Sequence, residues 1–229
     1  FKKLSSKEIL DASEIVYKDH YYNYIDDGIT INEPIINTVK NGNIHNIDLI
    51  IGSNNDEYSL YFGGIADVDG WLNAEVSDKQ KNKLTKLLSN IDDPIRKLDL
   101  LITAKNFVCP SLLIAKTVNL SGGNSWVYQF NRVRDDPKAL KYGAFHGAEL
   151  PYVFDTHDEW LPTNDIDRKI TEEVQSYWVQ FSKTGNPNLE QKMWDPYSAQ
   201  TNSTFIINEK SYSSSHPSYE ICKIMEPSW

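Results

Sequence analysis

Residues 47–52, with the sequence IDLIIG, restrict the possible fold more than any other stretch of this chain. A short apolar run rich in β-branched residues, followed by the polar sequence SNND at 53–56, is typical of a strand buried on both faces of a parallel sheet. In folds of this kind the loops at the carboxyl ends of the strands carry the active site. We therefore expect the residues that follow this strand to form a functional loop.

The rest of the chain alternates between helical and strand patterns. We expect helices at residues 6–18, about 35–41, 78–118 and 165–184, and further strands at residues 125–133 and 204–208. Within the second-last helical stretch, Pro94 suits a first turn, whereas Pro110 is expected to divide the stretch in two. Gly185 is the expected stop of the last helix. Alternation of this kind predicts an α/β fold with a mainly parallel sheet.

Composition and charge restrict the class of protein. The chain has 229 residues, of which 40% are hydrophobic and 24% charged, enough for one large globular domain or two small ones. Its formal net charge of −9 repels phosphate backbones, so we expect no nucleic-acid partner. The longest apolar stretch, residues 98–115, is interrupted by Lys105, Asn106 and Pro110. It falls short of the roughly 20 apolar residues of a membrane span, so none is expected.

The cysteines and the possible glycosylation motifs bear on the cellular compartment. The two cysteines, Cys109 and Cys222, allow one bridge or two free thiols, and we expect two buried thiols. Asn119 and Asn202 each begin an N-glycosylation motif, a short pattern that often arises by chance. The first eight residues lack the apolar core of a signal peptide, which says nothing about secretion if the chain is a piece of a longer protein.

Three residues lie where a hydrolytic triad would need its acid and its base. Such a triad combines a nucleophile, a histidine that shuttles its proton, and a buried carboxylate that fixes the histidine tautomer. Asp56 and Glu57 follow the first expected strand, and His146 lies in a glycine-containing loop after the second. Parallel strands would bring both loops to one edge of the sheet. Taken alone, the two carboxylates fit a solvated loop pair better than a catalytic site.

Two segments resemble type-B carboxylesterases, a family that includes lipases and cholinesterases. Residues 51–57, IGSNNDE, resemble the family's G-x-N-x-D-E segment, and residues 143–154, GAFHGAELPYVF, are similar to its histidine segment. The resemblance implies that Glu57 is the triad acid and His146 the general base. The chain order, acid before histidine, agrees with that of α/β-hydrolases.

The resemblance extends over nearly the whole chain. Residues 107–110 (FVCP), 177–188 (YWVQFSKTGNPN) and 194–197 (WDPY) are similar to further family segments in the same order. It implies that residues 1–229 are the C-terminal portion of a single α/β-hydrolase domain, with a mainly parallel sheet and a helical layer. One departure is Tyr58, because the family usually has glycine directly after the acid. This tyrosine would alter the hydrogen bonding of Glu57 or narrow the nearby pocket.

The nucleophile of the triad is missing from the sequence. There is no G-x-S-x-G elbow, since the nearest match, GGNSW at 122–126, lacks the closing glycine, and there is no HGG-type oxyanion loop. The resemblance places both in an N-terminal half that this chain does not contain. By itself, this chain should not hydrolyse esters.

We therefore expect a carboxylic ester hydrolase in which another chain or segment supplies the serine and the oxyanion hole. Its implied partners are the N-terminal half of the same esterase and a small ester substrate. The two halves would come from a precursor that is nicked into two associated chains, or this chain would be the segment that follows a disordered or cleaved loop. No cofactor or metal is implied. The alternative is a non-catalytic, cholinesterase-like adhesion or binding module. Frequent secretion in the family and the two glycosylation motifs favour an extracytoplasmic location, whereas the shortage of cysteines favours the opposite.

Several other residues are assigned structural roles. His20, His45, His157 and His216 lack a motif, and Glu149 is expected to be a structural carboxylate. Trp71, Trp126, Trp160 and Trp178 are assigned to the core or to pocket walls. Lys79, Lys81, Lys83 and Lys86 are expected to form a solvated helix face.

Overall fold

The computed structural model describes residues 3–18, 24–25, 27–44, 46–159, 161–190 and 194–226. The chain divides into two compact units, Phe1–Thr38 and Val39–Trp229. Each unit is described by itself, and the assignment of all 229 residues to one domain stays a prediction.

The first unit contains helix α1 (Ser6–Val16), which confirms the first expected helix. Its start is fixed by a capping box, in which the Ser5 hydroxyl accepts a hydrogen bond from the Glu8 amide and Glu8 accepts one from the Ser5 amide. None of its residues is buried, and Ile15 and Val16 are 79% and 67% exposed. The short helix α2 (Ile35–Lys40) lies at the boundary between the units and was also expected.

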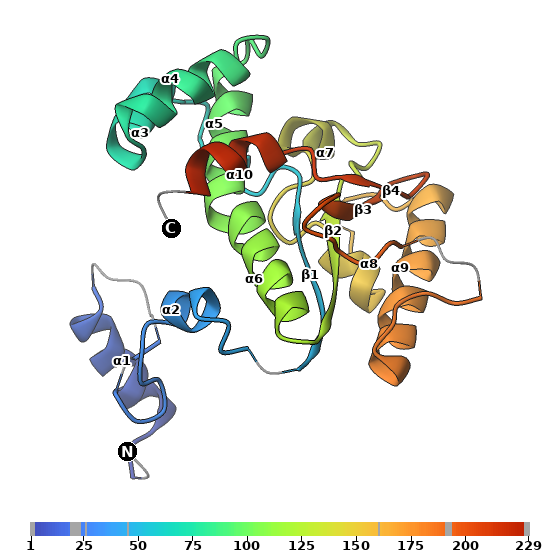
Figure 1. Ribbon diagram of the computed structural model, residues 1–229, viewed down its shortest axis with the longest axis horizontal. Coiled ribbons are helices and arrows are strands. Elements are labelled where there is room, and N and C mark those ends of the chain that lie inside the picture. Colours follow the sequence, from blue (N-terminus) through green and yellow to red (C-terminus); the bar gives the residue numbers. More distant parts are fainter. Residues whose placement is uncertain are drawn as a thin grey trace. The chain divides into compact units, whose positions relative to one another are not determined.

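The second unit is built on a four-stranded sheet in the order β1-β2-β3-β4 (Figure 1). Strands β1 (Asp48–Asn54), β2 (Asn124–Phe130) and β3 (Ser203–Ile207) are parallel, and β4 (Tyr212–Ser215) is antiparallel to β3. The three parallel strands were expected from their apolar runs. β4 was not, because its sequence YSSS contains no apolar pattern.

Helices cover both faces of the sheet. Helix α6 (Cys109–Leu120) contacts β1 and β2, whereas α9 (Asp165–Thr184) lies on the opposite side in Figure 1. Because side chains alternate along a strand, Val127 packs with the α6 cluster, and Trp126 and Phe130 pack with the α9 cluster. The result is a helix, sheet and helix arrangement with the carboxyl ends of the parallel strands at one edge.

The helical stretch that contains Pro110 is continuous, so the expectation that this proline divides it is wrong. Helices α3 (Val68–Glu75) and α4 (Asp78–Leu87) precede α5 (Pro94–Thr103), which runs through a π-helical turn, Ala104–Val108, into α6. In that turn the Cys109 amide donates to the Ala104 carbonyl, five residues back. The wider turn leaves room for the proline ring, which would otherwise clash with a preceding carbonyl.

By length and composition alone, the run Pro94–Leu120 could cross a membrane, since it has 27 residues and contains an 18-residue window with a mean hydropathy of 1.5. However, 56% of that window is buried inside the protein. Leu101, Ala104 and Ala115 are fully buried in the core. A core helix of a folded domain passes the same test, so the run does not indicate a membrane span.

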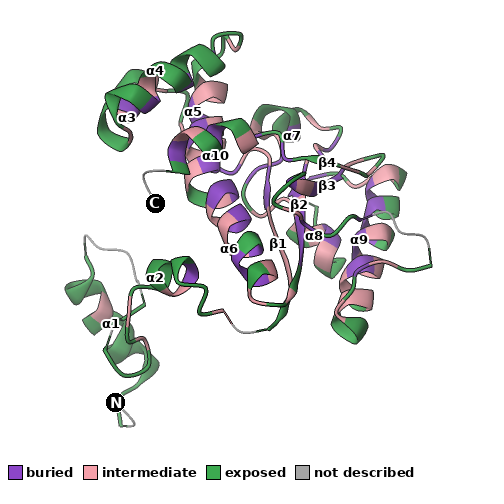
Figure 2. Cartoon of the chain, in the orientation of Figure 1, coloured by how far each residue is buried: buried purple, intermediate pink, exposed green. Residues whose placement is uncertain are grey.

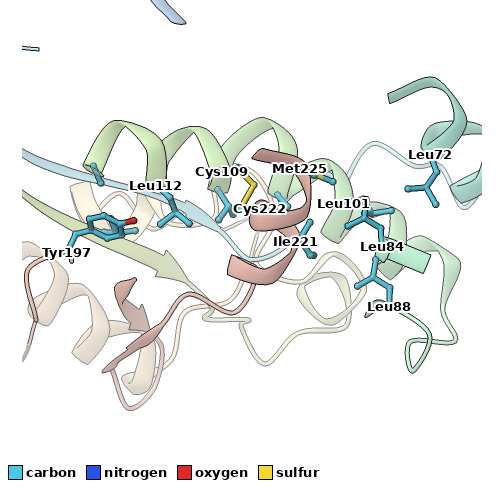
Figure 3. Packing of buried hydrophobic residues seen from close by; sticks show 14 residues of the cluster. Leu72, Leu84, Leu88, Leu101, Cys109, Leu112, Tyr197, Ile221, Cys222 and Met225 are labelled. Atoms are coloured by element: carbon cyan, nitrogen blue, oxygen red, sulfur yellow. A yellow bond between two sulfur atoms is a disulfide. The ribbon is translucent and has the colours of Figure 1, made fainter. Parts of the chain in front are cut away.

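The cluster on the α6 face contains a disulfide between Cys109 and Cys222 (Figure 3). Helix α10 (Tyr219–Met225), which was not expected, brings Cys222 to α6, with 5.3 Å between the two Cα atoms. The expectation of two buried thiols is therefore wrong. Leu112, Ile221 and Met225 surround the bridge.

The cluster on the α9 face is aromatic. Trp194 is fully buried and stacks on Phe205, and its indole donates to the Val127 carbonyl at 3.1 Å. Figure 2 shows the buried residues on the inward sides of α6 and α9. The expected core role is confirmed for Trp126, which is buried, and for Trp71 and Trp178, which pack against the two clusters. Trp160 lies outside the described residues.

Candidate active site

The loop after β1 holds Glu57 in a fixed position. Asn54, the last residue of the strand, donates its backbone amide to Glu57 Oε1 at 2.7 Å. Glu57 is only 4% exposed. Burial raises the pKa of this carboxyl, while the Asn54 amide and His146 act in the opposite direction. The strand thus ends in a buried carboxylate with one oxygen left for another partner.

The loop after helix α7 (Pro137–Tyr142) carries His146. Gly143 ends this helix with a positive φ of 68° and turns the chain toward the first loop. The Asn54 side-chain amide donates to the Phe145 carbonyl at 2.8 Å, which ties the two loops together next to the histidine. The His146 side chain is 52% exposed, so its ring is accessible from the edge of the sheet.

Glu57 and His146 are in direct contact, with 2.6 Å between Glu57 Oε2 and His146 Nδ1. A carboxylate at Nδ1 holds that nitrogen protonated and leaves Nε2 as the basic atom. It also stabilises the imidazolium that forms when Nε2 takes a proton. The two residues singled out in the sequence are therefore brought together in the geometry of an acid and a base.

Glu149 lies beside this pair without touching the histidine in any described contact. The Asn54 side-chain amide donates to Glu149 Oε2, so one asparagine connects Glu149, the Phe145 carbonyl and Glu57. The negative charge of Glu149 contributes to raising the pKa of Glu57, after the larger effect of burial. Glu149 therefore reaches the acid through Asn54, and the purely structural role expected for it stays a prediction.

An aromatic group flanks the histidine. The ring centroid of Phe107 lies 5.5 Å from that of His146 and 6.0 Å from that of Tyr58. The Asn106 side-chain amide donates to the Tyr58 hydroxyl at 3.1 Å. Tyr58, which the sequence marked as unusual, therefore stands against the aromatic neighbour of the base and leaves the Asn54 contact with Glu57 intact.

Arg96 and Asp99 on helix α5 also reach the loop that carries Glu57. Arg96 pairs with both Asp56 and Asp99, at 3.0 Å for Asp99. The Asp99 carboxylate accepts a hydrogen bond from the Tyr58 amide at 2.9 Å. Sequence reasoning missed both residues, because no motif marks them and they lie some 40 positions from the loop.

The remaining histidines described have structural partners. His216 is 3% exposed, and burial lowers its pKa to about 3. His157 contacts Arg134 at 3.0 Å and Thr171 at 2.7 Å. Both structural assignments are confirmed, while His20 and His45 lie outside the described residues.

The expected lysine face on α4 is present, since Lys79, Lys83 and Lys86 are exposed and Lys81 is half-buried. Across the described part of the chain, no group of three or more histidine, cysteine, aspartate or glutamate side chains is arranged to hold a metal ion.

The carboxylesterase family model matches residues 70–224. The chain belongs to the carboxylesterase family. The match includes His146 and begins after Glu57. Among similar proteins, the crystal protein of Dictyostelium discoideum is 25% identical over 221 residues, covering 87% of this chain and 39% of that protein. The para-nitrobenzyl esterase of Bacillus subtilis is 28% identical over 194 residues, covering 79% of this chain and 38% of that protein.

Solved structures confirm the fold. A PNB esterase aligns with a TM-score of 0.79 at 22% identity, covering 96% of this chain and 48% of that one. A carboxylesterase of Geobacillus stearothermophilus aligns with a TM-score of 0.77 at 20% identity, covering 97% and 49%. The fold is therefore part of an α/β-hydrolase with a mainly parallel sheet, as expected. This carboxylesterase-family chain spans about two fifths to one half of the length of the proteins it matches.

Proposed function

We propose that this chain supplies the acid and the base of a Ser-His-Glu triad in a carboxylic ester hydrolase. The observation that carries the proposal is the 2.6 Å contact between buried Glu57 and accessible His146, at the edge of the sheet in a chain of the carboxylesterase family. The serine and the oxyanion donors belong to another chain or segment of the same esterase. The substrate is a small carboxylic ester.

The reaction proceeds through an acyl-enzyme. His146 Nε2 takes the proton of the serine hydroxyl as the serine oxygen attacks the ester carbonyl, and the tetrahedral oxyanion is held by donors outside this chain. Glu57 stabilises the imidazolium formed at that moment. His146 then gives the proton to the leaving alcohol. Water, activated in turn by His146, hydrolyses the acyl-serine and restores the free enzyme.

Two features of the described residues are exposed, and the missing partner accounts for the first of them. Within the described residues, β1 pairs with β2 alone and leaves its other edge without a neighbouring strand. Helix α1 exposes the apolar side chains of Ile9, Leu10, Ile15 and Val16. An open strand edge and apolar surface of this kind favour association or aggregation. The N-terminal half of the esterase, as a separate chain or as a segment, is the occupant we propose for the strand edge.

A non-catalytic binding module is the second candidate. The similar crystal protein of Dictyostelium discoideum carries a name that states no enzymatic activity. However, a module without catalysis has no need for a buried carboxylate at 2.6 Å from an accessible imidazole. The presence or absence of a serine in the partner segment distinguishes the two candidates. An extracytoplasmic location remains part of the proposal, and the disulfide between Cys109 and Cys222 supports it, because such bonds persist in oxidising compartments.

Steady-state hydrolysis of p-nitrophenyl acetate by the complete esterase tests the proposal. His146→Ala should lower kcat by about 10³-fold or more, since a triad acts as a unit. His157→Ala is the matched control, because it removes an imidazole that contacts Arg134 and Thr171 instead of Glu57. Equal activity of the two variants would contradict the assignment of the base.

A further inference from the structure

We infer that Asp56 is a positioning residue that braces the Glu57 loop against the His146 loop. The inference deepens the proposed function and rests on it. Asp56 directly precedes Glu57, yet its carboxylate is bound to other groups than the triad pair. Its role follows from backbone pairing, a glycine that permits close approach, and an ion-pair cluster.

The first observation is a pair of hydrogen bonds between the loops. The Asp56 amide donates to the Ala144 carbonyl at 3.0 Å, and the Ala144 amide donates to Asp56 Oδ2 at 2.8 Å. Asp56 and Phe145 also form an isolated parallel bridge. These bonds join the residue just before the acid to the residues just before the base. The separation of Glu57 and His146 is therefore fixed by contacts that lie one residue before the acid and one or two residues before the base.

The second observation concerns Gly143. A Cβ atom at this position would overlap the Asp56 carboxylate. Gly143 also has a φ of +68°, a backbone conformation that residues with a Cβ atom rarely adopt. The backbone of the histidine loop thus approaches the Asp56 carboxylate so closely that only glycine fits at position 143.

The third observation is the cluster on helix α5. Arg96 pairs with Asp56 and with Asp99, and the Tyr58 amide donates to Asp99 at 2.9 Å. The residues on both sides of Glu57 are therefore held by one helix. The side chain of Asp99 is 2% exposed and that of Asp56 is 13% exposed, so water competes little for these bonds.

Together these contacts fix the acid and the base relative to each other. A carboxylate that stabilises an imidazolium must keep its distance and direction, and a displacement of about 1 Å at an active site lowers rates by about 10²-fold. Asp56 forms no described contact with His146. It therefore acts through Glu57 and the histidine loop, as a positioning residue.

The test uses the complete esterase with the variants Asp56→Ala, Asp56→Asn and Arg96→Met. We expect Asp56→Ala to lower kcat for p-nitrophenyl acetate by about 30- to 100-fold with little change in KM, because binding of the ester does not involve the brace. Asp56→Asn keeps an oxygen acceptor for the Ala144 amide but loses the ion pair with Arg96, so it should lower kcat by about 3- to 10-fold, as should Arg96→Met. Asp69→Asn is the control, since it removes an exposed carboxylate that pairs with Lys81 at 3.7 Å.

Repeating the Asp56 substitutions in a Glu57→Gln background separates positioning from general damage. A residue that acts through the acid has little further effect once the acid is gone, so Asp56→Asn should lower the residual kcat by less than about 2-fold there. The inference would be overturned if Asp56→Asn lowered kcat by the same factor with Glu57 present and with Glu57→Gln. It would also be overturned if Asp56→Asn and Arg96→Met both kept the wild-type kcat. If the wild-type esterase itself shows no activity, the proposed function fails instead. Should Asp56→Ala not fold, the Asn and Arg96 variants still decide the question.

Discussion

The ring of Phe107 lies 5.5 Å, centroid to centroid, from the ring of His146 and is tilted by 54°. Phe107 belongs to the π-helical turn Ala104–Val108, which widens the helix immediately before Pro110. Such turns are frequent at functional sites. The same local irregularity that keeps the helix continuous past the proline therefore brings an aromatic side chain to the base of the proposed triad.

Tyr58 should limit the size of the ester that reaches His146. Its ring packs against Phe107 at 6.0 Å, and Asn106 holds its hydroxyl. Replacing Tyr58 by glycine, the residue usual in the family, removes the aromatic ring that packs beside Phe107. We expect Tyr58→Gly to raise kcat/KM for p-nitrophenyl benzoate relative to p-nitrophenyl acetate by about 5- to 50-fold, which corresponds to roughly 1–2 kcal/mol. Tyr58→Phe is the control that keeps the ring, and an unchanged ratio in Tyr58→Gly would refute the prediction.

Asp99 should make the stability of the protein depend on pH. Burial raises its pKa to about 6 from the ordinary value of 3.8. Because the folded protein binds this proton more tightly than the unfolded chain, the contribution of Asp99 to stability falls as the pH rises from 3.8 through about 6. Asp99→Asn lacks this ionisation. The free energy of unfolding of Asp99→Asn minus that of the wild type should therefore be about 2–3 kcal/mol larger at pH 7 than at pH 4. This expectation does not depend on the absolute stability of the variant.

Denaturant titrations of both proteins at the two pH values measure this difference. A difference in unfolding free energy that is the same at pH 4 and pH 7 would mean that Asp99 ionises normally in the folded protein.

The disulfide between Cys109 and Cys222 should contribute strongly to stability. It closes a loop with a sequence separation of 113 residues, for which loop-closure entropy predicts roughly 4–5 kcal/mol. Cys109→Ser and Cys222→Ser should each lower the free energy of unfolding by similar amounts, and the double variant by no more than either. Additive losses would show that the two residues stabilise the fold independently of a bridge.

Neither glycosylation motif should be used. The side-chain amide of Asn119 donates to the Tyr197 carbonyl at 2.9 Å, and Asn202 is 6% exposed. An N-linked glycan is bulky and lies on the protein surface, so the folded structure does not accommodate one on a buried or hydrogen-bonded asparagine amide. Intact-mass measurement of protein from a secreting eukaryotic host should show no shift on treatment with an N-glycosidase. A loss of glycan mass that maps to either asparagine would contradict this expectation.

The sequence predicts those parts of the molecule whose signals are local. The apolar run that became β1 and the helix α9, with its start after Asn164 and its stop at Gly185, are confirmed because periodicity and caps act over a few residues. Glu57 and His146 were found through motifs that lie 89 positions apart and meet in the structure. The family resemblance assigned these two residues to one site, which hydrophobic periodicity alone could not have done.

The parts that were missed depend on tertiary contacts. Strand β4 is held by its pairing to β3, and its own sequence has no strand pattern. Arg96 and Asp99 reach the acid loop only because α5 packs beside it, and Cys222 meets Cys109 only because the short helix α10 packs against α4 and the π-helical turn that precedes α6. Pro110 was misread because a proline normally interrupts an α-helix, whereas a π turn accommodates it.

The most direct test of the proposed triad is labelling of the complete esterase with a fluorophosphonate probe, followed by a denaturing gel that displays every polypeptide present. We predict label on a serine outside these 229 residues, with a labelling rate that falls by at least about 10²-fold in His146→Ala and stays unchanged in His157→Ala. Absence of label from the wild-type protein, or labelling that does not depend on His146, would contradict the account.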